Sequence, residues 1–484
     1  MKKKDKISIK FLESLENELS KLKIDNTTSV GQLLPMSLYQ GIYCGDYFNK
    51  TLLKKIKIKL ALVLFNYKNN KSKIENFNYS KNIDGLITFT YNRADLIYLD
   101  TIVTKYFIDH QKKIQPIFFD QGILESKSLV AGLSTNDFCI LNISDILSFY
   151  NPEWFEKYKP IIELTEEILV KKLKDYKIYS DFLMDNLKFD LRTQIFHYSS
   201  WLKFLKIIKP SFIIVESDRN NLSSPVVMAS KKLNIASFSL MHGNVGYDFG
   251  YVPILASQLL VWGKQQKKYL IKAGAHEDQI KVVGAPQFSE DINLNKKSVL
   301  KELSIQTDKK IIVLATSNYK KISTRLKLIK IFAEALKVLS KDNWHGVIKM
   351  HPRDDSDLYS DYSECEYLLI LSSDKISKEA SFAIADYFCF FSSAIAFEAL
   401  LKKKKLILIM VDNKDIGECR SFIEKESVPV VINSNQLIKT INDGYSIKMQ
   451  NKLETFSKDY FFASGKKSLK NVYSHVNNYI KNKI

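Results

Sequence analysis

The sequence of 484 residues lacks the marks of a disulfide-rich or membrane-spanning protein. Its five cysteines form no close pair and no spacing typical of metal ligands. Its longest apolar runs, such as 60–65 and 406–411, are far shorter than the roughly 20 residues that a membrane-spanning helix needs. The basic start is not followed by the apolar core of a signal peptide. We therefore expect a protein of the reducing cytoplasm.

Arginine is also scarce, although the net charge is +19. Lysine supplies nearly all of the cations, and arginine occurs only at positions 93, 192, 219, 325, 353 and 420. Phosphate-reading grooves favour arginine forks, and the sequence has no arginine cluster and no basic motif with interleaved aromatics. The charge therefore does not indicate nucleic-acid binding. It leaves open a basic face that rests on an anionic inner membrane leaflet, as in a peripheral membrane protein.

Strands that alternate with helices of about ten residues predict two doubly wound α/β domains. The strands expected in the first domain are 85–91, 114–119, 138–143, 212–215, 236–241, 259–262 and 280–283, with helices 94–110, 191–208, 225–233 and 265–273 and a helical stretch over 154–190. The second domain repeats the pattern with strands 311–315, 346–350, 367–371, 387–391, 406–411 and 429–432, and with helices 325–339, 378–385, 394–400, 416–426 and 436–442.

These elements divide the chain into four parts. We expect a first domain over 1–286, a linker over 287–308, a second domain over 309–452 and a helical tail over 453–484 that crosses back onto the first domain. Two similar sheets that face one another make a cleft, and ligands bind in such clefts. Residues 1–80 carry little readable pattern.

Two turns at strand ends of the second domain suit an anion. One strand ends in His351-Pro352-Arg353, and another ends in Ser392-Ser393, directly before a helix. Ligands bind outside the carboxyl ends of the strands in such sheets. A serine at a helix N-cap, with the positive end of the helix behind it, suits a phosphate, to which His351 and Arg353 can add charge-assisted hydrogen bonds. Thr316 and Ser317 end a third strand and could touch the same phosphate.

The strand ends of the first domain and the motifs of the second, taken together, resemble the GT-B glycosyltransferases of bacterial surface polysaccharides. The motifs are Met241-His242-Gly243, Val261-Trp262-Gly263, Val283-Gly284-Ala285-Pro286, Lys349-Met350-His351-Pro352-Arg353 and Phe391-Ser392-Ser393-Ala394, the last followed by Phe397-Glu398-Ala399-Leu400. The resemblance covers about residues 210–440. It is greatest to families with an HP and an SS motif, which are capsule Kdo transferases, bacterial sialyltransferases and CDP-glycerol polyol-phosphate transferases.

The resemblance implies a GT-B fold and a nucleotide-sugar donor that is bound in the second domain. It implies that His351, Ser392 and Ser393 hold the donor phosphate and that Glu398 meets the ribose. The HP and SS pair makes a CMP-linked acidic sugar, such as Kdo or sialic acid, our first expectation for the donor. The acceptor is then a cell-surface glycan of the capsule or lipopolysaccharide class, in free or lipid-linked form.

Two other donors remain open. A polyol-phosphate transferase would use CDP-glycerol or CDP-ribitol, but its family usually has Asp-Tyr before the serine pair, where this chain has Phe390 and Phe391. A UDP-sugar 2-epimerase of the same fold would have a glycine-rich nucleotide turn, where this chain has Ala394 after Ser393.

Sugar transfer needs stabilisation of the leaving phosphate and a base for the acceptor hydroxyl. The helix N-terminus with His351 and Arg353 can meet the first need without a metal, so we expect no metal or other cofactor. The candidates for the base are His242, Glu216 and Asp218, each at a strand end of the first domain, with His242 ahead because Gly243 allows close approach of a substrate. Asp120 is a more distant candidate.

Each of these residues also has a plain structural interpretation. His351 and His242 can be ordinary turn residues, and the serine pair can be only a helix cap. Glu216 and Asp218 can be solvated loop charges. The Asp355-Ser356-Asp357 spacing lies in a polar loop, and we interpret it as solvated charge and not as a metal site.

Overall fold

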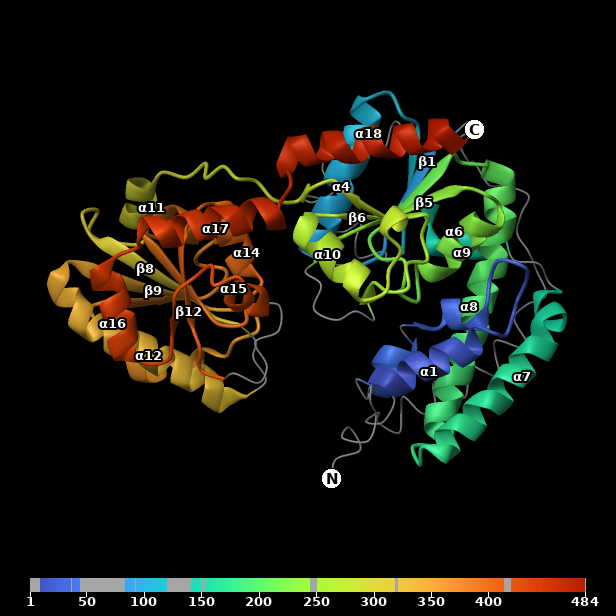
Figure 1. Cartoon of the computed structure of the whole chain (residues 1–484), viewed down its shortest axis with the longest axis horizontal. Helices are drawn as coiled ribbons and strands as arrows, with labels where there is room; N and C mark the ends of the chain where they lie inside the picture. The colour runs from blue at the N-terminus through green and yellow to red at the C-terminus, as the bar shows by residue number, and fades with distance from the viewer. Residues whose placement is uncertain are drawn as a thin grey trace. The chain divides into compact units, whose positions relative to one another are not determined.

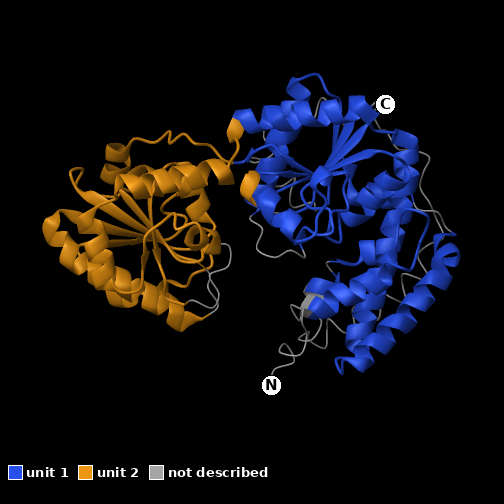
Figure 2. Cartoon of the chain, viewed as in Figure 1, with its two compact units in different colours: residues 1–262, 266–287, 466–484 blue, residues 263–265, 288–465 orange. Residues whose placement is uncertain are grey.

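The computed structural model shows two compact α/β units. It describes residues 9–35, 37–43, 83–91, 93–119, 141–149, 153–243, 250–317, 321–412 and 419–483. Unit 1 comprises residues 1–262, 266–287 and 466–484, and unit 2 comprises residues 263–265 and 288–465 (Figure 2). Each unit has its own parallel sheet with helices on both faces (Figure 1). The doubly wound α/β class that the sequence predicts is confirmed.

The sheet of unit 1 has seven strands in the described residues, in the order β3-β2-β1-β4-β5-β6-β7. The strands are β1 (Gly85–Phe89), β2 (Ile114–Phe118), β3 (Leu141–Asn142), β4 (Phe212–Val215), β5 (Ala236–Leu240), β6 (Gln258–Val261) and β7 (Ile280–Val282). Alternate residues of β1 enter different cores, since Leu86 packs on one face and Ile87 on the other. Burial on both faces explains why these strands are almost wholly apolar.

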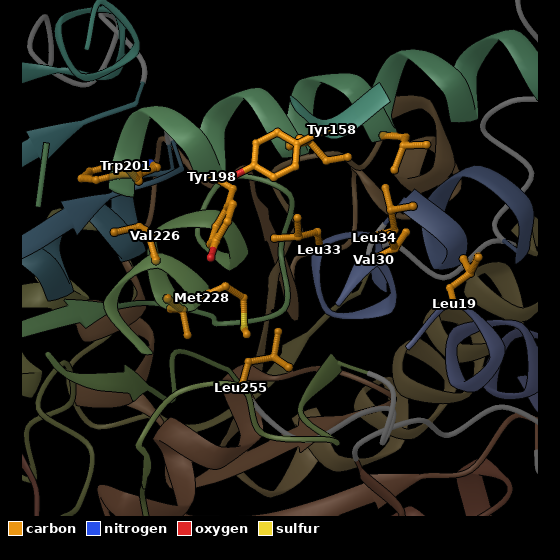
Figure 3. Close-up of a cluster of buried hydrophobic side chains, with 14 of the residues drawn as sticks. Leu19, Val30, Leu33, Leu34, Tyr158, Tyr198, Trp201, Val226, Met228 and Leu255 are labelled. Carbon is orange, nitrogen blue, oxygen red and sulfur yellow. The ribbon is translucent and has the colours of Figure 1, made fainter. Parts of the chain in front are cut away.

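Helices cover both faces of this sheet. One face carries α4 (Ala94–Asp109) and α18 (Gly465–Lys483), whose Val103 and Val472 share a core with the strands. The other face carries the amino-terminal helices α1 (Ile9–Leu19) and α2 (Val30–Leu33) together with α7 (Trp154–Asp175), α8 (Asp181–Ile208) and α9 (Ser224–Lys232). Figure 3 shows Leu33 of α2 in this second core, near Val226 and Met228 of α9. The first residues of the chain that the structure describes are therefore built into unit 1.

The long helices of unit 1 break at a different place from the one that the sequence predicts. Helix α7 spans Trp154–Asp175 and α8 spans Asp181–Ile208, so α8 runs through the expected boundary at residue 190. The break falls at 176–180 because Ser180 caps α8 by accepting a hydrogen bond from the Leu183 N–H at 3.2 Å. The expected boundary was wrong because nothing in the local sequence ends a helix there.

The sheet of unit 2 has six strands in the described residues, in the order β10-β9-β8-β11-β12-β13. The strands are β8 (Lys310–Ala315), β9 (Trp344–Lys349), β10 (Leu368–Leu371), β11 (Tyr387–Phe390), β12 (Lys405–Ile409) and β13 (Val430–Val431). The helices are α11 (Lys296–Glu302), α12 (Ile322–Leu339), α13 (Lys378–Ile384), α14 (Ile395–Leu401), α15 (Arg420–Glu424), α16 (Ser434–Asp443) and α17 (Ile447–Tyr460). All strand pairs are parallel.

The connections between the units differ from the expected boundaries in two ways. Residues 288–308 belong to unit 2, where Lys296 of α11 contacts Asp386 at 2.5 Å. The tail is two helices, since α17 stays in unit 2 and residues from 466 onward lie in unit 1. Helix α17 starts at residue 447, earlier than expected, because Ser446 caps it through the Met449 N–H.

Both sheets reverse their direction of growth next to their first strand. In unit 1 the chain builds β2 and β3 on one side of β1 and then β4 to β7 on the other. In unit 2 it builds β9 and β10 on one side of β8 and then β11 to β13 on the other. Ligands of such sheets bind where the order reverses, outside the carboxyl ends of the strands. That rule directs attention to the ends of β1 and β4 in unit 1 and of β8 and β11 in unit 2.

Candidate functional site

The turn after β9 is organised by one buried carboxylate, that of Asp354. It accepts hydrogen bonds from the Thr316 and Tyr359 hydroxyls, each at 2.6 Å, and forms an ion pair with Arg325 at 2.9 Å. The His351 N–H in turn donates to the Thr316 hydroxyl at 2.9 Å. Because the Asp354 side chain is fully buried, these contacts fix the turn to the end of β8.

The imidazole of His351 is held in one ring form. Its Nδ1 accepts a hydrogen bond from the Arg353 N–H at 3.1 Å, and an N–H can only donate, so the ring proton lies on Nε2. Burial lowers the pKa of His351 below its ordinary value, and the nearby cations Arg353, Lys349 and Arg325 lower it further against the opposing charge of Asp354. At neutral pH the ring therefore presents a neutral Nε2–H donor.

The turn after β11 has uncommitted donors. Within the described part of the chain, the Ser392 and Ser393 hydroxyls and the N–H groups of these two residues donate no hydrogen bond. Ser392 has a φ of 45°, in the left-handed region that residues with side chains rarely adopt. Backbone strain of this kind often marks a functional turn.

The serine pair does not cap the helix as the sequence predicts. The cap residue of α14 is Ala394, whose side chain cannot accept a hydrogen bond, and the helix begins at Ile395. Ser393 contributes its carbonyl, which accepts from the Ala396 N–H at 3.2 Å. The prediction of a serine cap was wrong because one more turn residue stands between the pair and the helix. Neither serine hydroxyl is used by the cap, and Ser392 is the more exposed of the two, since Ser393 is buried.

Thr316 and Ser317 join the two turns. The Ser317 hydroxyl donates to the Phe391 carbonyl at 3.0 Å, beside the serine pair, while Thr316 binds the turn of His351. Strand β8 lies between β9 and β11, so the two turns are two strand spacings apart, about 10 Å. Both hydroxyls are engaged within the protein, which suits a positioning role. Their predicted contact with a phosphate stays a prediction.

Two other predicted donor-binding residues differ in their availability. Glu398 on α14 is held by Lys378, whose Nζ lies 2.7 and 3.0 Å from the two carboxylate oxygens. A ribose hydroxyl would have to share Glu398 with this lysine. The Arg353 side chain is exposed and can turn toward a ligand.

Among the described residues, no group of His, Cys, Asp and Glu is arranged to hold a metal ion. In the Asp355-Ser356-Asp357 segment, Asp355 instead accepts a hydrogen bond from the Asp357 N–H.

In unit 1, His242 follows β5 and is held in the opposite ring form. Its Nδ1 lies 2.8 Å from the Glu216 carbonyl oxygen. A carbonyl can only accept, so Nδ1 carries the proton and Nε2 has the free lone pair. A Cβ placed on Gly243 would meet no atom of the described residues within 4 Å, so none of these residues crowds this position. A general base needs this ring form and this access.

The two other candidates for the base are buried. Glu216 is 1% exposed, and its Oε1 accepts a hydrogen bond from the Thr90 N–H at 3.1 Å. Asp218 is 2% exposed, and its Oδ2 accepts from the N–H groups of Leu255 and Ala256 at 2.7 and 2.8 Å. Burial raises the pKa of Asp218, against the opposing backbone hydrogen bonds and Arg219. Neither side chain is a solvated loop charge, and both are poorly placed to reach an acceptor. Asp120 lies outside the described residues.

The sequence reasoning missed the residues that position the candidate site. Asp354 stands next to the predicted HPR turn, but its role depends on Tyr359 and Arg325, which lie on other elements. Arg219 is fully buried and pairs with Glu16 of α1 at 2.9 Å, which ties the first helix to the end of β4. An aspartate shortly after a strand-end histidine was the one signal available for Asp354.

Comparison with known proteins gives a partial family match. A family model described as CDP-glycerol:poly(glycerophosphate) glycerophosphotransferase matches residues 269–478. That range includes all of the turns described in unit 2. The comparison with curated proteins gives no match.

Several solved structures share the fold. A putative UDP-N-acetylglucosamine 2-epimerase from Listeria monocytogenes has a TM-score of 0.54 at 12% identity, over 83% of this chain and 98% of that chain. The S. aureus MnaA-UDP co-structure has a TM-score of 0.50 at 13% identity, over 83% and 98%. A glycosyltransferase from Rickettsia africae has a TM-score of 0.50 at 15% identity, over 84% and 100%. These likenesses and the two parallel sheets show that the chain has a GT-B type fold.

Proposed function

We propose that the protein is a transferase that takes its donor from an activated nucleotide. The observation that carries the proposal is the pair of turns in unit 2. The uncommitted hydroxyls and N–H groups of Ser392 and Ser393 are donors at the sheet's switch point, and the neutral Nε2–H of His351 follows β9, the strand next to it. Such donors stabilise the charge that builds on a phosphate as the donor bond breaks.

The donor class rests on two lines of support that differ. The family model over residues 269–478 describes CDP-glycerol glycerophosphotransferases, which favours a CDP-linked polyol phosphate. The HP and SS motifs favour our first expectation, a CMP-linked acidic sugar. We rank the CDP-linked polyol phosphate first because the model matches most of unit 2, although Phe390 and Phe391 stand where that family usually has Asp-Tyr. Both donors have a cytidine and a phosphate, which the same turns can bind.

His242 is our candidate for the base that deprotonates the acceptor hydroxyl. In its ring form Nε2 carries the lone pair, and no atom of the described residues would meet a Cβ on the neighbouring Gly243. We propose that the transfer needs no metal, because neutral and cationic donors of unit 2 can stabilise the phosphate. Full turnover in the presence of EDTA would support this, and restoration of activity only by Mg²⁺ would contradict it.

The acceptor is proposed to be a surface glycan or its lipid-linked precursor, reached from the inner face of a membrane. Among the described residues, no helix is long and apolar enough to cross a bilayer. Helix α12 and the turn after it expose four lysines and two apolar side chains, Leu326, Lys327, Lys330, Lys337, Val338 and Lys341, with the exposed Glu334 paired to Lys330 among them. Such a surface is suited to anionic lipid headgroups. High salt should release the protein from anionic vesicles, and retention at high salt would contradict an electrostatic contact.

The test of the proposed function is binding of a nucleotide panel followed by turnover. A ligand that binds only the folded protein raises its melting temperature. We expect CMP and CDP to raise it more than UDP, GDP and ADP, and His351→Ala to remove the shift. Incubation with CDP-glycerol or a CMP-linked acidic sugar then separates the two donors, since the first reaction releases CMP with transfer of glycerol phosphate and the second releases CMP with transfer of the sugar. A shift with UDP alone would overturn the cytidine assignment.

A further inference from the structure

The turn that follows β4, residues 216–221, contacts both the candidate base and the amino-terminal segment of the chain, and we call it the β4 turn. On the side of the base, the Glu216 carbonyl accepts a hydrogen bond from His242 Nδ1 at 2.8 Å. The Glu216 side chain fixes this residue to the end of β1, because its Oε1 accepts from the Thr90 N–H at 3.1 Å. The ring form of His242 therefore depends on where the β4 turn places one carbonyl.

The β4 turn also holds the loop that supports Gly243. Asp218 Oδ2 accepts hydrogen bonds from two N–H groups of the loop before β6, at 2.7 and 2.8 Å. Arg219 Nη1 donates to the Pro253 carbonyl of the same loop at 3.2 Å. This loop carries Tyr251, whose hydroxyl donates to the Gly243 carbonyl at 3.1 Å. The candidate base and the glycine after it are therefore both held through the β4 turn.

The β4 turn is itself fixed by a buried ion pair with the amino-terminal segment. Arg219 Nη2 lies 2.9 Å from Glu16 Oε2 of α1, and the two side chains are 0% and 7% exposed. Since the guanidinium is a rigid planar fork, its contacts with Glu16 and with the Pro253 carbonyl set the position of residue 219. A second contact joins the same parts, because the Ser37 hydroxyl donates to Asn221 Oδ1 at 3.1 Å.

The pair supplies direction more than stability. Apolar side chains of similar volume can fill a buried site of this kind with equal or greater stability, because two buried charges lose their hydration. An apolar side chain at position 219, however, could not bind a carboxylate and a carbonyl at fixed angles. Arg219 and Glu16 therefore give the β4 turn one orientation, and the contacts of the turn pass this orientation to His242.

We propose that the buried pair Glu16–Arg219 positions His242 through the β4 turn, so that its Nε2 lone pair faces the acceptor hydroxyl. Both are positioning residues, because they are buried and act through another residue. The inference rests on the proposed role of His242 as the base, although the effect of the pair on the His242 ring can be measured without any activity.

The ring form of His242 reports on the pair in the protein alone. The chain has seven histidines, so nitrogen NMR of protein labelled only at histidine gives few signals, and His242→Gln identifies the one from His242. Wild type should show the proton on Nδ1. Arg219→Met removes the fork that fixes the turn, so the proton should move to Nε2 in a fraction of the molecules. An unchanged His242 signal in Arg219→Met would overturn the inference.

Turnover measures the consequence for the transfer. Glu16→Gln leaves Arg219 buried without its charge partner, and kcat should fall by about 10- to 100-fold, the loss that a small misplacement of a catalytic group causes. The nucleotide-induced rise in melting temperature should stay as in wild type, because the donor turns lie in unit 2. Glu18→Gln is the matched control. Glu18 lies on the same helix but pairs with Lys172 of α7 at 2.7 Å, so kcat should not change.

Two double variants separate positioning from a general loss of stability. Glu16→Gln combined with Arg219→Met leaves no unpaired charge, so the melting temperature should recover relative to Glu16→Gln while kcat stays low. Wild-type kcat in this variant would contradict a positioning role. In a His242→Gln background, Glu16→Gln should lower kcat no further, because both changes act on the same group. A full additional loss there would show that the pair supports only the fold.

The outcomes separate this inference from the proposed function. If His242→Ala loses activity but Glu16→Gln keeps wild-type kcat, the inference is overturned and the transferase proposal stands. If His242→Ala is fully active, the assignment of the base fails and the inference fails with it. Should Arg219→Met not fold, the double variant with Glu16→Gln gives the same NMR measurement with both charges removed.

Discussion

The two histidines at strand ends, His242 in unit 1 and His351 in unit 2, differ in which ring nitrogen carries the proton. His351 Nδ1 meets a backbone N–H, so its Nε2 donates, whereas His242 Nδ1 meets a backbone carbonyl, so its Nε2 accepts. A donating imidazole suits a phosphate, and an accepting one suits a hydroxyl proton. The comparison teaches that one backbone group beside the ring can decide the chemistry that the residue offers.

The two rings also differ in how their turns are held. The turn of His351 is fixed by a buried ion pair between Asp354 and Arg325, and burial keeps its ring neutral. His242 is fixed by the backbone of Glu216, whose buried side chain accepts a hydrogen bond from the Thr90 N–H. The first arrangement stabilises a neutral donor, and the second orients a ring nitrogen that can accept a proton.

The largest expected effect is that of His242→Ala. Loss of a general base should lower kcat by about 1000-fold, while nucleotide binding to unit 2 stays unchanged. Steady-state kinetics and the melting-temperature shift with nucleotide measure the two properties separately. The matched control is His242→Gln, which removes the basic nitrogen with less change in volume. A Gln variant with wild-type activity would show that no base is needed at this position.

His351→Ala should affect the binding of the donor phosphate in unit 2. Removing one preorganised donor to the phosphate should lower kcat/KM by about 100-fold and should abolish the nucleotide-induced shift in melting temperature. His351→Gln can restore an N–H donor and should recover part of both. The two histidines would lose their distinct roles if His351→Ala left nucleotide binding intact and lowered only kcat.

Asp354→Asn tests whether the turn of His351 depends on its buried ion pair. The change leaves Arg325 without its charge partner, so the free energy of unfolding should fall by about 3 kcal/mol, and nucleotide binding should weaken with it. Asp357→Asn makes the same chemical change at an exposed position shortly after the turn, and it should have almost no effect.

Chemical denaturation of both variants gives the two free energies. Equal values for Asp354→Asn and Asp357→Asn would show that the ion pair does not hold the turn.

Gly243→Ala should have a smaller effect, confined to the acceptor side. A Cβ there meets no described atom of the protein, so the melting temperature should not change, but it occupies the space beside His242 and should raise the KM of the acceptor. Gly263→Ala is the contrast, since its Cβ would lie 2.3 Å from the Tyr460 carbonyl oxygen and should lower the melting temperature. An unchanged acceptor KM in Gly243→Ala would argue against substrate approach at this point.

The smallest effect is spectroscopic and leaves activity intact. Nitrogen NMR of the two rings should show protonated Nε2 in His351 and protonated Nδ1 in His242, and the same ring form in both would contradict the difference between the two histidines.

The pKa of His351 should lie below the ordinary value of about 6.5. Because the unfolded chain then binds a proton more readily, this part of the stability is present above about pH 6.5 and is lost as the pH falls toward the folded pKa. His351→Gln should reduce that loss.

Much of the fold follows from local pattern, and the errors have local causes. The strands of both sheets are apolar runs bounded by turn residues, and most fall within one or two residues of the expected bounds. The break before α8 was misplaced because Ser180 ends a stretch that is otherwise helical on both sides. The cap of α14 was predicted one residue too early. Serine is a common cap residue, but here the helix begins after Ala394, so neither serine stands at the cap position.

The candidate site was predictable only in part. His351, Ser392 and His242 stand at strand ends in the sequence, and the sheet order brings two of these ends next to β8. An aspartate at a strand end, such as Asp218, is a residue type that can act as a base. In the structure, however, its carboxylate accepts hydrogen bonds from the backbone N–H groups of Leu255 and Ala256. A strand-end carboxylate and a buried structural one are alike in sequence, because the partners that distinguish them come from other elements.

The sequence by itself determined the alternation of strands and helices, and with it the two parallel sheets and the edge at which their polar residues gather. This follows because hydrophobic periodicity and turn residues act over a few positions. Only the tertiary structure decided which nitrogen of each histidine is protonated and that Asp354 holds a turn. These features depend on contacts between residues that lie far apart in the chain, and on burial that no local pattern records.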